Sequence, residues 1–210
     1  PTSLALLRDR KLLVRTVCDA ITQQLATDHP EGGDVLAFLP GAGEVRATVK
    51  ELQSRRSKAE VLPLYGSLSR EEQDLALSDG PKGRRRRVVV ATPIAEASLT
   101  LPSVTCVVDS GLRREARRDV DGMPRLVTVR CSAASATQRA GRAGRVRDGT
   151  CIRLYPEDEL TGDSPLFPAD SPPEISSADL SATILLLTDW GCSGPDEVAD
   201  MPFVDLPPAG

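Results

Sequence analysis

The chain has 210 residues, 40% of them hydrophobic, which is enough to bury one full α/β core with some chain left over. It has no apolar run of about eighteen residues, and residues 1–7 lack the features of a signal peptide, so we expect neither a membrane span nor export. The net charge of −4 conceals a basic segment, because residues 84–153 contain fifteen Lys and Arg against six Asp and Glu. Such a segment favours a polyanionic partner, although the run at 84–87 on its own is typical of a solvated tract.

The cysteines and the single histidine argue against a metal site. The five cysteines form no C-x-x-C pair and are odd in number, which favours reduced thiols over disulfides or a zinc site. His29 lies beside Pro30 in a turn-like stretch and is interpreted as an ordinary surface residue. We therefore expect a reducing, cytoplasmic location and no metal held by this chain.

Helix and strand patterns alternate along most of the chain. Apolar residues at helical spacing predict a helix over residues 4–26, and further helices are predicted over 44–55 and 67–78. Short apolar or β-branched runs predict strands at residues 34–40, 60–65, 87–92, 104–109 and 150–155. This alternation predicts an α/β fold with a mostly parallel central sheet of the doubly wound type.

Two later segments depart from the alternation. Residues 113–120 and 126–130 flank an Asp-Gly pair that favours a turn, and together they predict a β-hairpin. Residues 161–173 contain four prolines, and residues 174–190 then predict a separate helix. We expect one domain over residues 1–160 and a linker with a C-terminal helical extension over 161–210. The apolar stripe of that last helix either packs back on the sheet or is covered by chain beyond Gly210.

The segment at residues 136–147 reads ATQRAGRAGRVR. On a helix, Gln138, Arg142 and Arg145 fall at i, i+4 and i+7 and share one face, from which Arg139 points away. Guanidinium groups bind phosphate oxygens with two parallel hydrogen bonds and stabilise charge on them, so this face is suited to a polyphosphate. A solvated basic helix end has the same spacing, and both interpretations stay open.

Two glycines, Gly141 and Gly144, lie in the same segment. Each costs about 1 kcal/mol in a helix relative to Ala. Their presence predicts that another backbone or a ligand approaches this flank closely.

Three segments, in order along the chain, resemble motifs IV, V and VI of DEAH-box helicases, and most closely those of the HrpB-type group. They read FLPGAGEV at residues 38–45, ATPIAEASLT at 91–100 and QRAGRAGR at 138–145. The resemblance covers residues 10–205. It implies a RecA-like domain of the P-loop-NTPase type, the second of the two in an ATP-dependent nucleic-acid helicase. From residue 173 onward it implies the start of a winged-helix region.

The resemblance also implies roles at the nucleotide. Gln138 would orient the attacking water, Arg142 and Arg145 would contact the γ-phosphate as arginine fingers, and Ser98 would sense that phosphate. The sequence contains no G-x-x-x-x-G-K-[ST] loop and no Asp-Glu-x-His, so ATP and Mg²⁺ would be held mainly by the first RecA-like domain, the implied partner. We expect the chain alone not to hydrolyse ATP.

Other residues would contact single-stranded RNA or DNA. Thr92 and Thr100 would hydrogen-bond its backbone from the carboxyl edge of the sheet, with helix capping as the alternative role for such hydroxyls. The hairpin, with Arg113 and Arg114, would wedge against the strand being unwound, although a solvated basic ribbon fits these arginines equally well. Two other classes of function stay open, a non-catalytic binding module for nucleic acid or a partner, and a structural domain of a larger assembly.

Overall fold

A computed structural model describes residues 3–26, 33–56, 59–78, 85–96, 101–118, 123–146, 148–163, 165–176 and 180–205. The chain divides into two compact units, the first made of Pro1–Glu115 and Thr128–Asp170, the second of Ala116–Val127 and Ser171–Gly210. No helix within the described ranges is long and apolar enough to cross a bilayer.

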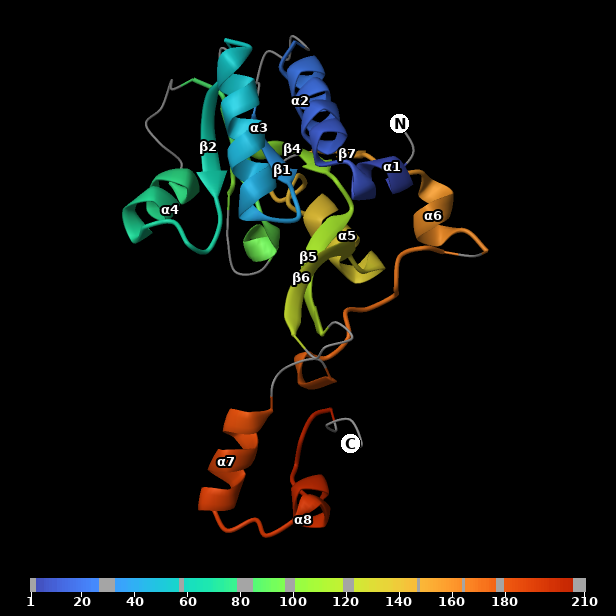
Figure 1. Cartoon of the computed structure of the whole chain (residues 1–210). Coiled ribbons are helices and arrows are strands. Elements are labelled where there is room, and N and C mark those ends of the chain that lie inside the picture. Colours follow the sequence, from blue (N-terminus) through green and yellow to red (C-terminus); the bar gives the residue numbers. More distant parts are fainter. Residues whose placement is uncertain are drawn as a thin grey trace. The chain divides into compact units, whose positions relative to one another are not determined.

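Five parallel strands form the sheet of the first unit, in the order β2-β3-β1-β4-β7 (Figure 1). They are β1 (Asp34–Phe38), β2 (Glu60–Leu64), β3 (Arg87–Ala91), β4 (Val104–Asp109) and β7 (Thr150–Arg153). Every residue of β1 and β3 is buried, because both faces of these inner strands are covered. The predicted α/β fold with a mostly parallel sheet is confirmed.

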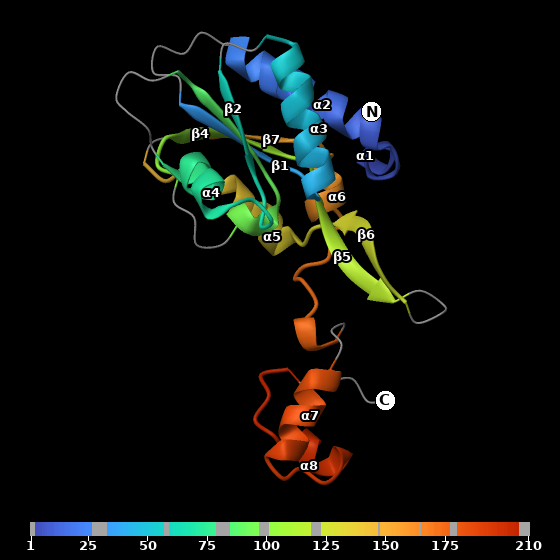
Figure 2. The same cartoon turned by 60° about the vertical axis from the view of Figure 1, so that its left-hand side comes forward.

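Helices cover both faces of the sheet (Figures 1 and 2). On one face, α2 and α3 pack against side chains such as Val35 and Val88, and on the other, α4 and η1 pack against Leu36 and Val89. Neighbouring residues of one strand thus serve opposite cores, as the alternation of side chains along a strand requires. The helices of these two layers are α1 (Ser3–Arg8), α2 (Arg10–Ala26), α3 (Ala42–Ser54), α4 (Arg70–Leu77) and the 3₁₀ helix η1 (Pro93–Ala95).

Side-chain caps set two of the helix starts. The predicted helix over residues 4–26 is interrupted at Asp9, whose Oδ1 accepts hydrogen bonds from the N–H groups of Lys11 (2.8 Å) and Leu12 (3.1 Å) and so begins α2. Apolar spacing continues across this break and could not reveal it. The predicted cap before α4 is confirmed, since Ser69 and Glu72 form a reciprocal capping box.

The hairpin leads directly into the helix of the arginine-rich segment. Strands β5 (Leu112–Arg118) and β6 (Pro124–Arg130) confirm the predicted hairpin, and α5 (Ala133–Ala140) follows after two residues. The prediction of a helix that continues to residue 147 is wrong, because α5 ends at Ala140. Two glycines with low helix propensity follow, and the N–H groups of Arg142 and Ala143 bond to carbonyls three residues back, both at 3.1 Å.

The other helices of the described residues are short. They are α6 (Glu157–Thr161), the 3₁₀ helix η2 (Glu174–Ser176), α7 (Ser181–Asp189) and α8 (Pro195–Ala199). The helix predicted over 174–190 therefore begins later, at Ser181. The sequence patterns did not predict α6 and α8. In the second unit, Leu185 and Trp190 are exposed. The division of the chain at residue 160 stays a prediction.

Candidate functional site

The residues predicted to bind phosphate lie on α5 and on the turn after it. Gln138 is exposed on α5, whereas Arg142 and Arg145 lie beyond its end, in residues 141–146. The prediction that these three side chains share one face of a helix is therefore wrong. Arg142 is half-buried, and burial together with the positive charge of Arg145 lowers the pKa of its guanidinium, although the charge of Glu96 opposes this.

Thr92 directly follows β3 at the carboxyl edge of the sheet. Its N–H donates to the carbonyl oxygen of Leu64 (3.0 Å), and its side chain is half-buried. It occupies the N-cap position of η1, but its hydroxyl makes no capping hydrogen bond, so capping does not explain a Thr here. Ser98 and Thr100 lie outside the described residues.

The predicted hairpin arginines are paired with carboxylates of the same chain. Arg113 forms an ion pair with Glu115 on the same strand. Arg114 Nη2 lies 3.2 Å from Oε1 of Glu44, a buried carboxylate in the first turn of α3 that also lies 3.3 Å from Nε of Arg10. Much of the positive charge at the start of β5 is thus neutralised within the domain, which weakens the case for Arg113 and Arg114 as phosphate contacts.

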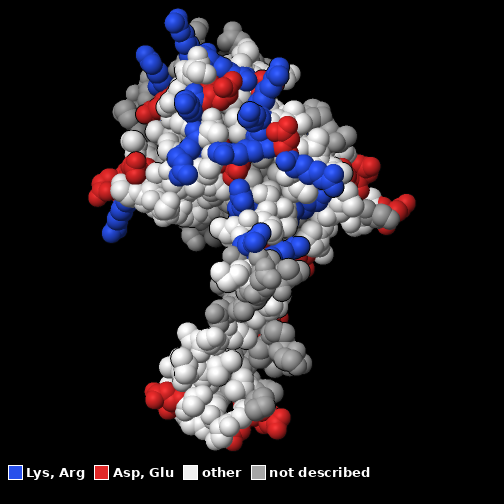
Figure 3. Space-filling view, in the orientation of Figure 1, with Lys and Arg blue, Asp and Glu red and all other residues white. Residues whose placement is uncertain are grey.

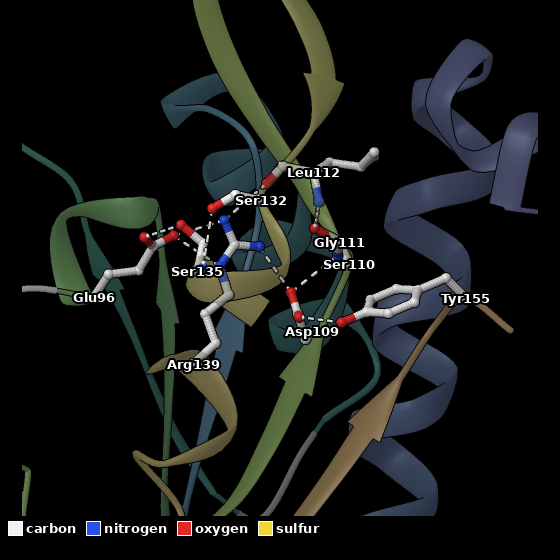
Figure 4. A network of polar contacts seen from close by, with 9 residues as sticks. All are labelled: Glu96, Asp109, Ser110, Gly111, Leu112, Ser132, Ser135, Arg139 and Tyr155. Carbon is white, nitrogen blue, oxygen red and sulfur yellow. Dashed lines mark hydrogen bonds and ion pairs between the residues drawn. The ribbon is translucent and has the colours of Figure 1, made fainter. Parts of the chain in front are cut away.

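A buried network surrounds the arginine that points away from the predicted face (Figure 4). Arg139 has no exposed surface. Its Nε donates to Glu96 Oε1 (2.7 Å), its Nη1 to Asp109 Oδ1 (2.8 Å) and its Nη2 to the carbonyl oxygen of Leu112 (3.2 Å). Its Cζ lies 5.2 Å from the centre of the Phe38 ring. One side chain therefore joins α5 to the ends of β1, β4 and β5 and to the segment after β3.

Asp109, the last residue of β4, is the acidic centre of the network. It is fully buried and accepts hydrogen bonds from the Tyr155 hydroxyl (2.8 Å) and the Gly111 N–H (2.9 Å) as well as from Arg139. Burial lowers the pKa of Arg139, but the charges of Asp109 and Glu96 more than offset this and raise it overall. Burial and the Asp109 charge raise the pKa of Tyr155. Both donors therefore keep their protons at physiological pH.

Gly111, between β4 and β5, can only be glycine. Its φ of +70° lies in the left-handed region, and a Cβ there would come within 2.6 Å of the Tyr155 ring and 2.9 Å of the Phe167 ring. The turn from the sheet into the hairpin is thus fitted closely over the Asp109 carboxylate.

Sequence reasoning missed this network, although it contained one usable signal. Asp109 ends an otherwise apolar buried strand, and a carboxylate in such a place requires partners. The partners could not be found from spacing, because Glu96, Arg139 and Tyr155 come from three separate segments that only the folded sheet brings together.

Positive charge on the surface is not confined to residues 84–153. Figure 3 shows Lys and Arg side chains over the face that carries α2 and α3. Within 84–153, by contrast, Arg87 and Arg139 are buried in ion pairs with aspartates. The charge count therefore overstated what that segment presents to a partner. Exposed cations of the first three helices are Arg8, Arg10, Lys11, Arg15, Arg46 and Lys50.

The turn with Arg142 and Arg145 is cationic and suits phosphate oxygens better than Mg²⁺, an ion that binds oxygen ligands. Within the part of the chain that the structure describes, no group of three or more His, Cys, Asp or Glu side chains could hold a metal.

The fold and the site together define a class of protein. A parallel sheet covered on both faces, with a hydroxyl and paired guanidinium groups beyond its carboxyl edge, is typical of a RecA-like domain that contributes one half of a nucleotide site. Residues 14–147 match the helicase conserved C-terminal domain, and the chain belongs to that family.

Relatives of known description are DEAH-box helicases. The chain is 44% identical over 180 residues to the ATP-dependent RNA helicase HrpB of Escherichia coli, covering 85% of this chain and 21% of the relative. It is 41% identical over 170 residues to a probable ATP-dependent RNA helicase, the DHX35 homolog of Caenorhabditis elegans, covering 78% of this chain and 22% of the relative.

A crystal structure of the Escherichia coli DEAH/RHA helicase HrpB has a similar fold. It matches with a TM-score of 0.80 at 42% identity, over 92% of this chain and 24% of that one. The resemblance to DEAH-box helicases of the HrpB type is confirmed. The chain spans only about a fifth to a quarter of the length of these relatives.

Proposed function

We propose that this chain is the C-terminal motor domain of an ATP-dependent RNA helicase and supplies the arginines that complete the ATP site of a preceding domain. The observation that carries the proposal is the placement of Arg142 and Arg145 on the short turn that directly follows α5, the helix with the exposed Gln138. Burial and the charge of Arg145 outweigh the attraction of Glu96 and lower the pKa of Arg142, and a polyphosphate placed against the two guanidinium groups would favour their charged forms.

In this proposal each group has one task. Arg142 and Arg145 neutralise charge that develops on the γ-phosphate during transfer, and Gln138, exposed on the preceding helix, orients the attacking water. Ser98, from the segment after η1, senses the γ-phosphate. ATP and Mg²⁺ are held mainly by the first RecA-like domain of the same helicase, and this chain alone does not hydrolyse ATP.

Nucleic acid lies along the carboxyl edge of the sheet. Thr92 is placed there with its hydroxyl unused for capping, and Thr100 is assigned the same role from the motif resemblance. These are contacts to the sugar-phosphate backbone, which carry no sequence preference and weaken as salt is raised. We assign residues 1–160 to the motor domain and 161–210 to a linker and the start of a helicase-associated region.

The test uses the full-length parent protein and single-stranded RNA. Arg142→Ala is expected to lower the RNA-stimulated ATPase rate by about 10³-fold, as loss of an arginine finger does in related NTPases. Lys50→Ala, which removes an exposed cation from α3, serves as the control and should retain the wild-type rate. Full ATPase activity in Arg142→Ala would refute the finger assignment.

A parallel titration with single-stranded DNA identifies the substrate. Stimulation by RNA and not by DNA supports the proposed substrate. A parent protein that binds RNA but shows no ATPase activity would instead identify a binding module built on a helicase domain.

A further inference from the structure

Helix α5 is joined to the base of the hairpin at both of its ends. At the amino end, the chain runs from β6 through Cys131, whose N–H donates to the Gly111 carbonyl (2.9 Å), into Ser132, which caps the helix. Near the carboxyl end, Arg139 reaches back to the Leu112 carbonyl (3.2 Å). Covalent and hydrogen-bonded links thus form a closed ring that holds the helix to the hairpin base, and Figure 4 shows the part of it that runs from Arg139 to Leu112.

The segment after β3 is held by the same helix. Glu96 accepts hydrogen bonds from Nε of Arg139 (2.7 Å) and from Oγ of Ser135 (3.0 Å), residues one helical turn apart. Thr92, which we place on the nucleic-acid backbone, lies four residues before Glu96. The 3₁₀ helix η1 lies between them, and the Ala95 N–H donates to the Thr92 carbonyl oxygen (3.2 Å), so a short hydrogen-bonded turn links Thr92 to Glu96 and, through Glu96, to α5.

Arg139 also holds the turn that carries the proposed fingers. It is the last residue but one of α5, and its own carbonyl oxygen accepts the N–H of Arg142 (3.1 Å). The residue whose side chain contacts the hairpin base and Glu96 thus fixes, through its backbone, the first residue of the finger pair.

We propose that Arg139 is a positioning residue that couples nucleic-acid contacts after β3 to the placement of Arg142 and Arg145, and that it holds both against the hairpin base. The proposal rests on the proposed function. A guanidinium is required because its three nitrogens donate to three segments at once in a planar fork. Arg139→Lys keeps the buried charge but replaces the fork with a single ammonium on a flexible stem, which loosens this joint.

The chain provides a matched control at the opposite edge of the sheet. Arg87 is also buried, and its Nε lies 3.3 Å from Oδ2 of buried Asp34. It lies at the amino end of β3, away from the edge that carries the proposed site. Arg87→Lys therefore makes the same chemical change in a buried ion pair without touching the proposed coupling.

The experiment measures ATPase rates of the full-length parent protein with and without saturating single-stranded RNA, for wild type, Arg139→Lys and Arg87→Lys. Thermal unfolding identifies a temperature at which all three proteins are folded. Fluorescence anisotropy measures their affinity for RNA. In Arg139→Lys, the ratio of stimulated to basal kcat should fall by about tenfold, the size of a typical coupling between sites, with KM for ATP and RNA affinity retained. In Arg87→Lys the ratio should stay at the wild-type value.

The outcomes separate coupling from structure. Equal losses of the ratio in the two variants, or an unchanged ratio in Arg139→Lys, would overturn the proposal. If Arg139→Lys does not fold, Glu96→Gln takes its place, since it weakens one of the three links and should lower the ratio by a smaller factor. An unchanged ratio in Glu96→Gln would then overturn the coupling. Wild-type protein without any RNA-stimulated ATPase would refute the proposed function itself.

Discussion

Two buried arginines pair with aspartates at opposite edges of one sheet, and only their surroundings differ. Arg87 and Asp34 begin β3 and β1, and Asp34 accepts further hydrogen bonds from the Arg87 N–H (2.9 Å) and Ser103 Oγ (2.7 Å). Asp109 ends β4 and pairs with Arg139 of α5. The amino-edge pair holds strand starts together, whereas the carboxyl-edge pair gathers every segment to which we assign a described site residue.

The difference shows that burial and pairing do not by themselves indicate function. Ligands of parallel α/β sheets bind beyond the carboxyl ends of the strands, where the connecting loops converge. An ion pair at that edge links the connecting segments to one another, and an ion pair at the other edge links only parts of the scaffold. The coupling test above probes this difference, and three further measurements probe the two edges and the charge of Arg139.

Removal of the two guanidinium groups should have unequal effects on stability. Arg139→Met leaves two carboxylates, Asp109 and Glu96, without their cation, whereas Arg87→Met leaves one, Asp34. A buried ion pair that loses one partner costs about 3 to 5 kcal/mol, so we expect Arg87→Met near the lower and Arg139→Met near the upper value. Urea denaturation of the 210-residue chain measures both losses of unfolding free energy, provided that the slope of that free energy against urea concentration is the same in the two variants. A larger loss in Arg87→Met would show that the carboxyl-edge network is not the stronger of the two.

The scaffold was predictable because its signals are local. Apolar runs predicted all five strands of the parallel sheet to within two residues of their observed ends. Ser69 and Glu72 predicted a capped helix start. The break at Asp9 was not predictable from periodicity, since the apolar stripe runs across it. At this point the Asp9 side chain caps a new helix, although the helical spacing of apolar residues continues.

The assignment of the site residues stays a prediction, and their geometry could not be predicted from the sequence. Gln138, Arg142 and Arg145 were found from spacing on a helix that in fact ends at Ala140. What fixes their placement is the buried side chain of Arg139, whose partners come from distant segments. Local pattern can identify such an inward-facing arginine but cannot supply its acceptors.

Alkaline pH tests whether Arg139 is fully engaged by carboxylates. Burial raises the pKa of Cys131, next to Arg139, and of Cys18 in α2 to about 12, from an ordinary value of 9.0. A raised pKa means that the unfolded state loses its proton first, so stability is complete below pH 9 and falls as pH rises toward 12. Each thiol should contribute about 1 kcal/mol of this loss between pH 9 and 10.

Cys131→Ala and Cys18→Ala should therefore reduce the alkaline loss of unfolding free energy equally, measured by urea denaturation at pH 9 and 10. Arg139 lowers the pKa of Cys131 while Asp109 and Glu96 raise it, so a clearly smaller reduction in Cys131→Ala would mean that the guanidinium outweighs the two carboxylates at this thiol. That result would contradict an Arg139 charge that Asp109 and Glu96 neutralise.

Glycines at the two edges give the comparison with the smallest expected effect on stability. Next to the amino-edge pair, a Cβ on Gly33 would come within 2.3 Å of the Thr105 side chain and 2.7 Å of the Ser103 carbonyl, so packing inside the chain explains this glycine. A Cβ on Gly144, between the proposed fingers, would meet nothing within 4 Å. Gly144→Ala should therefore change the unfolding free energy by no more than about 0.5 kcal/mol, while Gly33→Ala destabilises the chain.

If the first RecA-like domain approaches this turn closely, the added methyl group would displace it. Gly144→Ala in the parent protein should then lower RNA-stimulated ATPase by about tenfold or more, because small displacements at a reacting phosphate are costly. A wild-type ATPase rate together with unchanged stability would show that no partner surface packs against Gly144. The prediction of a close approach, made from the two glycines of this segment, would then be wrong at this position.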